Sequence, residues 1–348
     1  DSSKKEFYEE ANIVRKRAQL LLLFAFLIST LLYPEIIYQP LEQSTFAKIN
    51  DETLSEELLT SRSKIVYLLS DIYNSYPEFY SVLTRTATGV DLMNTYLQDQ
   101  ALKIVNQVLF IQFVEQKNID LQRQQTWNNI EENFSKTFKD VGIPDEEIDN
   151  YLLALGYTSK TNYLEDAYYL TLYNNSISAL YTKIIQETEI TDEEMIVEYQ
   201  NNKAIYKSDP AADIKLIIFN STEDASYTYN RIIEGYYTYD EVFEQTESAT
   251  SMRINLKDDS NSLVQTVKSN PPGFITTPLL YDSQNGTYAL LKIERKYPEK
   301  QLTFEEAKDQ IIFNLKDKKA QEYFDKVLPT EFQKFQEESS IILNSDMF

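Results

Sequence analysis

The side chains of this sequence that could do chemistry are carboxylates, lysines and tyrosines, because the chain contains no histidine and no cysteine. Histidine is the most frequent general base, and histidine and cysteine are the main ligands of structural zinc. Their absence excludes catalytic triads, thiol nucleophiles, disulfides and zinc sites built on these residues. An enzyme of this sequence would have to work with carboxylates, Lys or Tyr, so a role without covalent chemistry is favoured.

The acidic clusters offer no convincing catalytic pair. Residues 145–147 and 192–194 each stand in the predicted first turn of a helix, where capping and the helix dipole explain a carboxylate. Asp258 and Asp259 fall in a predicted loop, and nothing around them completes a cation shell. The chain also lacks a GxxxxGK phosphate-binding loop. We therefore predict no catalytic residue, no metal site, no cofactor and no ATP-driven cycle.

The net charge of −22 argues against nucleic acid as a partner, because phosphate binding needs clustered Lys and Arg. The absence of cysteine fits an oxidising compartment, where stray thiols are a liability. Tyr and Phe are abundant, with 26 and 18 residues. A tyrosine ring suits surfaces that bind varied partners, although most such rings fill helix interfaces.

The uncharged run Ala18–Pro34 follows three basic residues and resembles a signal or anchor sequence. It is shorter than the ~20 residues that a spanning helix needs. An apolar stripe with helical spacing also continues upstream through the charged residues: Phe7, Ala11, Val14, Ala18, Leu21, Ala25, Ile28 and Leu32. We predict one long helix over 3–33 outside a membrane, so that a signal peptide or membrane anchor would have to lie upstream of residue 1.

Capping residues and apolar stripes predict further helices along the chain. Thr53 and Glu56 form a capping box before a helix with Leu58, Ile65, Leu68, Leu69 and Ile72 inward, which Pro77 breaks. Helices are predicted over 91–117 and 120–139, in a short segment ending at Gly156, and up to about residue 187. Thr191 and Glu194 cap one more.

The character changes at residues 208–210, after which short apolar runs predict strands at 214–219 and 288–295. Residues 225–234 are predicted to be helical, and 251–266 to be polar and irregular. A final helix over 303–335 begins with the pair Thr303 and Glu306 and carries an apolar stripe that must be covered. We expect it to dock against residues 1–190, or to exchange between two subunits in a homodimer.

These elements predict an α+β fold that is predominantly α. The predicted domains are a discontinuous helical domain, 1–207 with 300–348, and an inserted small α/β module, 208–299. The order of the helical motifs is specific: "LQDQALKIVNQVLFIQFVEQKNI", then "IPDEEIDNYLLALGYTSKTNYLED", then "EITDEEMIVEYQNNKAIY". This stretch, Tyr96–Tyr206, resembles the helical chaperone region of SurA, PrsA and PpiD, which is related to the C-terminal domain of trigger factor.

In that family a parvulin-type prolyl isomerase follows, and the next segment is similar to a shortened one. "DIKLIIF" matches its first strand, "ASYTYNRIIEGYYTYDEVFEQ" its helix, "PPGFITTPL" its Gly–x–Ile–Ser–x–Pro turn and "YALLKIERK" its last strand. Active parvulins carry histidines on the first and last strands, and Lys215 and Ala289 are read here at those positions. The resemblance therefore implies an isomerase-like module without its catalytic residues.

We predict an ATP-independent, extracytoplasmic holding chaperone (periplasmic or associated with the cell envelope) that binds unfolded or nascent exported polypeptides. The alternatives are a residual peptidyl-prolyl isomerase and a non-catalytic docking or scaffold protein of an envelope complex. A holding chaperone needs exposed apolar surface rather than reactive groups. Its candidate client-binding residues are Leu20, Leu23, Leu27, Leu31, Tyr163, Tyr168, Tyr169 and Tyr173, for each of which burial in the core is the competing interpretation.

Overall fold

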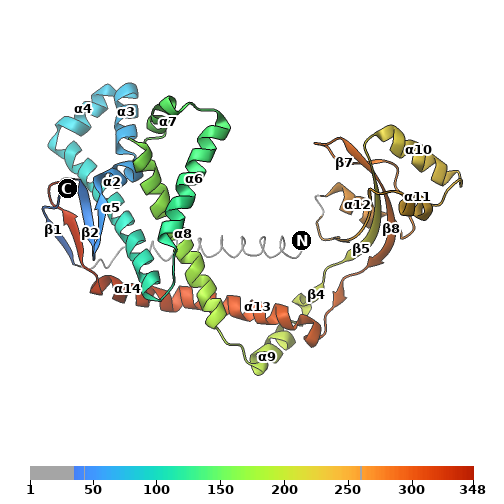
Figure 1. Ribbon diagram of the computed structural model, residues 1–348. Coiled ribbons are helices and arrows are strands. Elements are labelled where there is room, and N and C mark those ends of the chain that lie inside the picture. Colours follow the sequence, from blue (N-terminus) through green and yellow to red (C-terminus); the bar gives the residue numbers. More distant parts are fainter. Residues whose placement is uncertain (1–34, 43, 259–260) are drawn as a thin grey trace. The chain divides into compact units, whose positions relative to one another are not determined.

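The computed structural model describes residues 35–42, 44–258 and 261–348, and within these the chain forms two compact units (Figure 1). Unit 1 comprises the chain up to Glu189 together with Lys316–Phe348, and unit 2 is Ile190–Leu315. The helix predicted over 3–33, with Leu20, Leu23, Leu27 and Leu31, lies outside the described residues. The predicted fold class, α+β and predominantly α, is confirmed.

Unit 1 is built mainly from helices, and capping side chains begin three of them. Ser55, Thr86 and Ser159 each accept a hydrogen bond from the backbone N–H three residues further on. The helices are α2 (Glu56–Ser63), α3 (Ile65–Ser75), α4 (Pro77–Arg85), α5 (Ala87–Gln116), α6 (Arg123–Val141), α7 (Ile148–Ala154), α8 (Lys160–Glu187) and α14 (Leu328–Glu338).

A four-stranded sheet, which the sequence did not predict, closes one side of unit 1. Its strands are β1 (Ile36–Gln39), β2 (Thr45–Ile49), β3 (Glu52–Ser55) and β10 (Ile341–Asn344), in the order β1-β10-β2-β3. Strand β10 pairs parallel to β1 and antiparallel to β2. The last strand of the chain therefore lies in the middle of a sheet otherwise made near the start of the described chain.

The capping box predicted at Thr53 and Glu56 is wrong. Thr53 lies in β3, opposite Lys48 of β2, and Ser55 caps the helix instead. The turn between the two strands places Asn50 at φ 52°, in the left-handed region that Asn tolerates. Strand pairing prevails over capping here because it buries Phe46, Ile49 and Leu54 completely.

The helix that the sequence predicts between Thr53 and Pro77 is interrupted at Lys64. This residue has φ 55° and ends α2, and α3 starts directly after it. The interruption turns α3, so that Leu68, predicted to point inward, is 39% exposed. Helix α3 then contains no buried residue.

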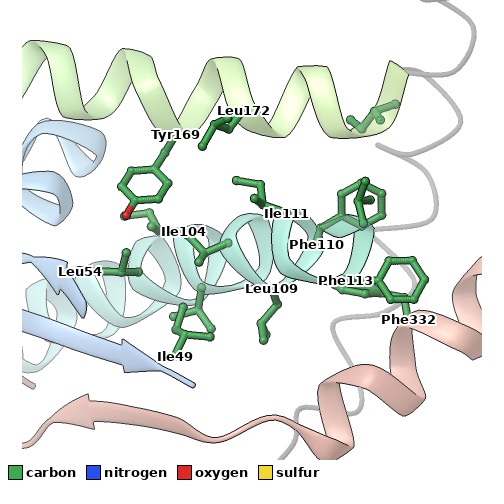
Figure 2. Close-up of a cluster of buried hydrophobic side chains, with 14 of the residues drawn as sticks. Ile49, Leu54, Ile104, Leu109, Phe110, Ile111, Phe113, Tyr169, Leu172 and Phe332 are labelled. Atoms are coloured by element: carbon green, nitrogen blue, oxygen red, sulfur yellow. The ribbon is translucent and has the colours of Figure 1, made fainter. Parts of the chain in front are cut away.

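Helix α5 forms the centre of the hydrophobic core of unit 1 (Figure 2). Its buried face lies between α8, which contributes Tyr169 and Leu172, and the sheet, which contributes Ile49 and Leu54. The α5 side chains in this cluster include Ile104, Leu109, Phe110, Ile111 and Phe113.

The final helical segment packs into this same core through its C-terminal part, from Ala320 onward. It consists of α13 (Phe304–Glu322), a π-helical turn (Tyr323–Val327) and α14. The π turn coincides with Pro329 at the start of α14, which has no N–H to continue the α-helical ladder. Ala320, Phe324, Leu328 and Phe332 are buried against α5 and its neighbours, and the Phe332 ring lies 5.4 Å from that of Phe110.

Unit 2 contains a second four-stranded sheet, in the order β6-β5-β8-β7, with every pair antiparallel. Its strands are β5 (Ala211–Phe219), β6 (Ala249–Asn255), β7 (Leu279–Asp282) and β8 (Thr287–Tyr297). Helices α10 (Thr222–Ile233) and α11 (Tyr239–Gln245) cover one face, and α12 (Ser262–Ser269) covers the other (Figure 1). The segment 251–266, predicted to be irregular, instead supplies most of β6 and the start of α12.

Two further segments complete unit 2. Helix α9 (Asp192–Asn202) begins with the predicted capping box of Thr191 and Glu194 and packs through Met195 on Ala307 and Ile311 of α13. Strands β4 (Lys207–Ser208) and β9 (Lys300–Gln301) pair beside them. These contacts place residues 190–207 and 300–315 in the same compact unit as the sheet. The domain boundaries at 207/208 and 299/300 stay a prediction.

Candidate functional site

An ion cluster lies on the central strands of the sheet in unit 2. Lys215 of β5 pairs directly with Lys292 of β8, so both side chains leave the sheet on the face covered by α10 and α11. Asp240, at the start of α11, accepts hydrogen bonds from both ammonium groups, at 2.7 Å from Lys215 Nζ and 2.6 Å from Lys292 Nζ. Glu294 lies 2.9 Å from Lys292 Nζ. Two ammonium groups and two carboxylates thus form a neutral cluster.

Electrostatics favour the charged forms of Lys292 and Asp240. Burial disfavours the charge on Lys292, but the hydrogen bonds to Asp240 and Glu294 outweigh it and raise the pKa of this lysine. The same hydrogen bonds, from Lys215 and Lys292, lower the pKa of Asp240. The pKa values of Lys292 and Asp240 are therefore shifted away from the near-neutral range that general acid–base catalysis needs.

Tyr239 stands beside the cluster but is engaged with the backbone. Its hydroxyl lies 2.9 Å from the carbonyl oxygen of Lys215 and 2.8 Å from that of Leu290. Burial raises its pKa, and the charge of Asp240 adds to the effect. Tyr239 thereby joins α11 to both central strands, β5 and β8, and its role is structural.

The position read as the second histidine, Ala289, does not face Lys215. Ala289 pairs with Ile218 and is buried in the cluster that α12 covers, on the opposite face of the sheet. Successive residues of a strand point to opposite faces, so a strand aligned by sequence alone is easily misplaced by an odd number of positions. The residue that faces Lys215 across the ladder is Lys292, three positions further on.

The turn predicted from "PPGFITTPL" lies along the open edge of β8. Gly273 adopts φ 85°, which allows its N–H to reach the carbonyl oxygen of Ile293 at 2.6 Å. Thr276 is buried, and its hydroxyl accepts a hydrogen bond from the backbone N–H of Leu291. The turn is therefore bonded into the sheet next to the ion cluster.

A second candidate site is an exposed apolar surface on unit 1, called here the α3–α4 surface. It consists of nine large apolar side chains between 38% and 69% exposed, on α3, α4, the link between them and the first turns of α5: Val66, Tyr67, Leu68, Tyr73, Tyr76, Phe79, Val82, Val90 and Leu92. A helix as apolar as α3 with no buried residue is unusual for a soluble surface. Such a surface indicates a binding role.

Three contacts give the α3–α4 surface its shape. The rings of Tyr73 and Tyr80 meet edge to face with centroids 5.1 Å apart, which joins α3 to α4. Gly89 lets α5 approach α4 closely: a Cβ at this position would lie 2.6 Å from the Leu83 Cα, and closer still to the Val82 carbonyl oxygen. The hydroxyl of Thr86 donates to the same Val82 oxygen and accepts from Gly89 N–H.

Helix α7 extends this surface at one edge. Tyr151 and Leu153 of α7 and the next residue after the helix, Leu155, are also exposed, and α7 lies near α3 at the same end of unit 1 (Figure 1). The contact is made by Lys64, whose Nζ donates to the Leu155 carbonyl oxygen at 3.1 Å and lies 3.3 Å from the centre of the Tyr157 ring.

The four tyrosines predicted to bind clients all lie on α8, but they point mainly into unit 1. Tyr169 is only 7% exposed and donates a hydrogen bond to Glu52 Oε1. Tyr173 packs edge to face on Phe110, and Tyr163 packs on Phe134 and Tyr157. Burial of this kind favours the core interpretation for Tyr163, Tyr169 and Tyr173.

Tyr168 differs from the other three in lining a described cavity. With Arg123, Gln124 and Trp127 it lines a hollow of about 390 Å³, and its ring meets Trp127 edge to face at 5.4 Å. Arg123 is engaged in ion pairs with Glu52 and Glu115. The client-binding role of these tyrosines stays a prediction.

The sequence pattern does not predict the α3–α4 surface, because it places Leu68 and its stripe on an inward helix face. The sequence nevertheless indicates an exposed apolar face, because all five residues of "IVYLL" (65–69) are apolar or aromatic. A helix that buries one face cannot bury five consecutive residues. In the described ranges, no helix is both long and apolar enough to cross a membrane. The same ranges hold no group of three or more acidic side chains placed to bind a metal ion.

The architecture thus combines a mostly helical unit with a small antiparallel sheet covered by helices. No protein-family model matches the chain. The foldase protein PrsA of Clostridium perfringens (strain 13 / Type A) is 26% identical over 299 residues, which span 82% of each chain. The predicted resemblance to SurA/PrsA-type chaperones with a parvulin-like module is thereby confirmed.

Solved structures show similarity of the same kind. The foldase PrsA of Lactococcus lactis is 15% identical, with 87% of this chain and 96% of that chain covered and a TM-score of 0.28. One of two SurA-like chaperones of Campylobacter jejuni is 15% identical, with 84% and 97% covered and a TM-score of 0.30. The assignment rests on the curated relative rather than on these structures.

Proposed function

We propose that the protein is an ATP-independent, extracytoplasmic holding chaperone that binds unfolded or nascent exported polypeptides on the α3–α4 surface, and that its isomerase-like module is catalytically inactive. The observation that carries the proposal is α3, an apolar helix with no buried residue. Unfolded polypeptides expose the apolar side chains that such a surface can cover.

The composition of the α3–α4 surface supports weak and unselective binding. Tyr73, Tyr76 and Phe79 present rigid rings, which bury a large area while losing little conformational entropy. Neighbouring aliphatic side chains, such as Val66 and Val82, widen the contact without adding hydrogen-bond demands. Binding of this kind needs no nucleotide, because release follows from weak affinity rather than from an energy-consuming step.

The ion cluster of unit 2 supports the loss of isomerase activity. Rotation about an X–Pro bond has a barrier of about 20 kcal/mol, which an isomerase lowers in a desolvated, shaped pocket. Here the facing positions on β5 and β8 are Lys215 and Lys292, both bonded to Asp240. A proline would have to approach charged groups that already satisfy one another.

An aggregation assay tests the holding function. The protein should slow light scattering of several unrelated denatured substrates without nucleotide. The variant Val66→Ser/Phe79→Ser/Val82→Ser should lose most of this effect, because each residue contributes exposed apolar area to the surface. A matched control, Tyr227→Ser/Ile233→Ser/Tyr237→Ser, removes three exposed apolar side chains from unit 2 and should keep the effect. Equal losses in both variants would contradict the assignment to α3 and α4.

A proline-peptide assay tests the inactive module. The protein should not accelerate cis–trans exchange above the uncatalysed rate. Acceleration comparable to that of an active parvulin would favour the alternative of a true isomerase. If the protein neither slows aggregation nor accelerates cis–trans exchange, the remaining alternative is favoured, a non-catalytic docking or scaffold protein of an envelope complex.

A further inference from the structure

The α3–α4 surface carries an uneven set of charges. Between residues 65 and 92 the chain has three carboxylates, Asp71, Glu78 and Asp91, and a single basic residue, Arg85. All four side chains are exposed. The carboxylates stand among the apolar residues rather than apart from them: Glu78 precedes Phe79, and Asp91 lies between Val90 and Leu92.

The basic residues at the edge of this surface are already engaged. Lys64 is held over the Tyr157 ring and bonded to the Leu155 carbonyl oxygen. Arg62 forms an ion pair with Asp166 and donates to Gln107 Oε1 at 2.7 Å. In the part of the chain that the structure describes, no ammonium or guanidinium group lies within ion-pairing distance of Asp71, Glu78 or Asp91. Within the described residues, these carboxylates therefore remain open to a cation from a partner.

We propose that the α3–α4 surface selects client segments in which apolar residues alternate with Lys or Arg. The inference rests on the proposed holding function and adds the chemical class of the bound segment. Apolar side chains of the client cover the rings and aliphatic groups, and its ammonium or guanidinium groups meet the three carboxylates. Complementary charge of this kind contributes specificity and association rate more than raw affinity.

The exposure of the three carboxylates determines how strongly a basic client is preferred and how much salt weakens that preference. Exposed ion pairs are individually weak, so that three of them shift affinity by about tenfold. Screening over a Debye length of about 8 Å at physiological ionic strength should remove much of this preference in high salt. The apolar contribution is unaffected by screening and should remain.

Three fluorescent 15-residue peptides with the same apolar residues provide the test. Lys, Gln or Glu occupies the alternate positions, and fluorescence anisotropy gives the dissociation constants at low and high salt. The wild-type protein is compared with Asp71→Asn/Glu78→Gln/Asp91→Asn. A matched control, Glu132→Gln/Glu244→Gln/Glu247→Gln, removes the same charge at exposed positions elsewhere.

The wild-type protein and the control should bind the Lys peptide about tenfold more tightly than the Gln peptide, and the Glu peptide least tightly. The Asp71/Glu78/Asp91 variant should lose most of the Lys preference and keep its affinity for the Gln peptide. An unchanged Lys preference in this variant, or an equal loss in the control, would overturn the inference. The serine variant of the surface separates the two proposals: if it binds all three peptides like the wild type, the holding surface itself is misplaced.

Discussion

Glu52 is the residue on which a polar network of unit 1 converges. Its carboxylate accepts hydrogen bonds from Arg123 at 2.9 Å, Tyr169 at 2.9 Å and Gln112 at 3.0 Å, and so joins β3 to α5, α6 and α8. Burial alone would raise the pKa of Glu52, but the hydrogen bonds, led by that from Arg123, outweigh it and lower the pKa. The ionised form is therefore the one that the folded state stabilises.

The sign of this shift gives a prediction for acid stability. A carboxyl whose pKa is lowered by folding contributes stability above the ordinary Glu pKa of about 4.3 and loses it as the pH falls through the folded value. Glu52→Gln should cost about 1–3 kcal/mol of unfolding free energy at pH 7, and the cost should shrink towards pH 3. Urea unfolding between pH 3 and 7 measures it. A cost that is equal at both pH values would mean that the charge of Glu52 does not matter.

At the scale of elements, the packing of α5 on α4 depends on Gly89. Gly89→Ala places a methyl group against the backbone of Leu83 and Val82, which cannot move without separating the two helices. The expected loss is about 1–3 kcal/mol of unfolding free energy, the usual range for overpacking. Aggregation suppression should fall as well, because the shape of the α3–α4 surface depends on this contact.

The control for Gly89→Ala is Thr88→Ala, an exposed neighbour in the same turn of α5. It introduces the same side chain without approaching α4 and should leave both stability and suppression nearly unchanged. Thermal unfolding and light scattering of the two variants give the comparison. If Gly89→Ala were as stable as the wild type, α4 would have to be free to shift along α5.

At the scale of the whole molecule, unit 1 depends on the end of the chain. Residues 328–348 supply Leu328 and Phe332 to the core, and β10 to the middle of the sheet. Full burial of each large apolar side chain contributes about 1.5–3 kcal/mol, so their joint loss approaches the whole stability of a typical domain, about 5–15 kcal/mol. Deletion of 328–348 should unfold unit 1 and leave unit 2 folded. Hydrogen exchange read by mass spectrometry would locate the loss.

Phe332→Ala is the milder form of this test, because it leaves β10 in place. The ring contacts Phe110 and Phe113 edge to face, and its removal should cost about 3–5 kcal/mol. Exchange protection should fall in α5 and remain in the sheet of unit 2, whose core is formed by other residues. Equal loss of protection in both units would contradict their independence.

Short-range signals in the sequence determined helix caps, a strand and a turn of this protein. The capping box at Thr191 and Glu194 and the hydrogen bonds of Thr303 with Glu306 form as predicted, because each involves residues only three positions apart. The strand at 214–219 and the turn at 271–279 likewise followed from local pattern and resemblance. The missing imidazoles were evident from composition alone and needed no structure.

The tertiary structure decided what depends on distant partners. Strand β10 becomes a central strand only because β1 and β2, about 300 residues earlier, accept it on both sides. Lys292 rather than Ala289 faces Lys215 because the ladder between β5 and β8 sets the register, and a strand presents alternate residues to opposite faces. Likewise, the left-handed turn at Lys64 exposes α3, whose apolar pattern by itself indicated burial. An apolar sequence shows that a surface needs a partner, and the packing of the other elements determines whether that partner lies within the chain.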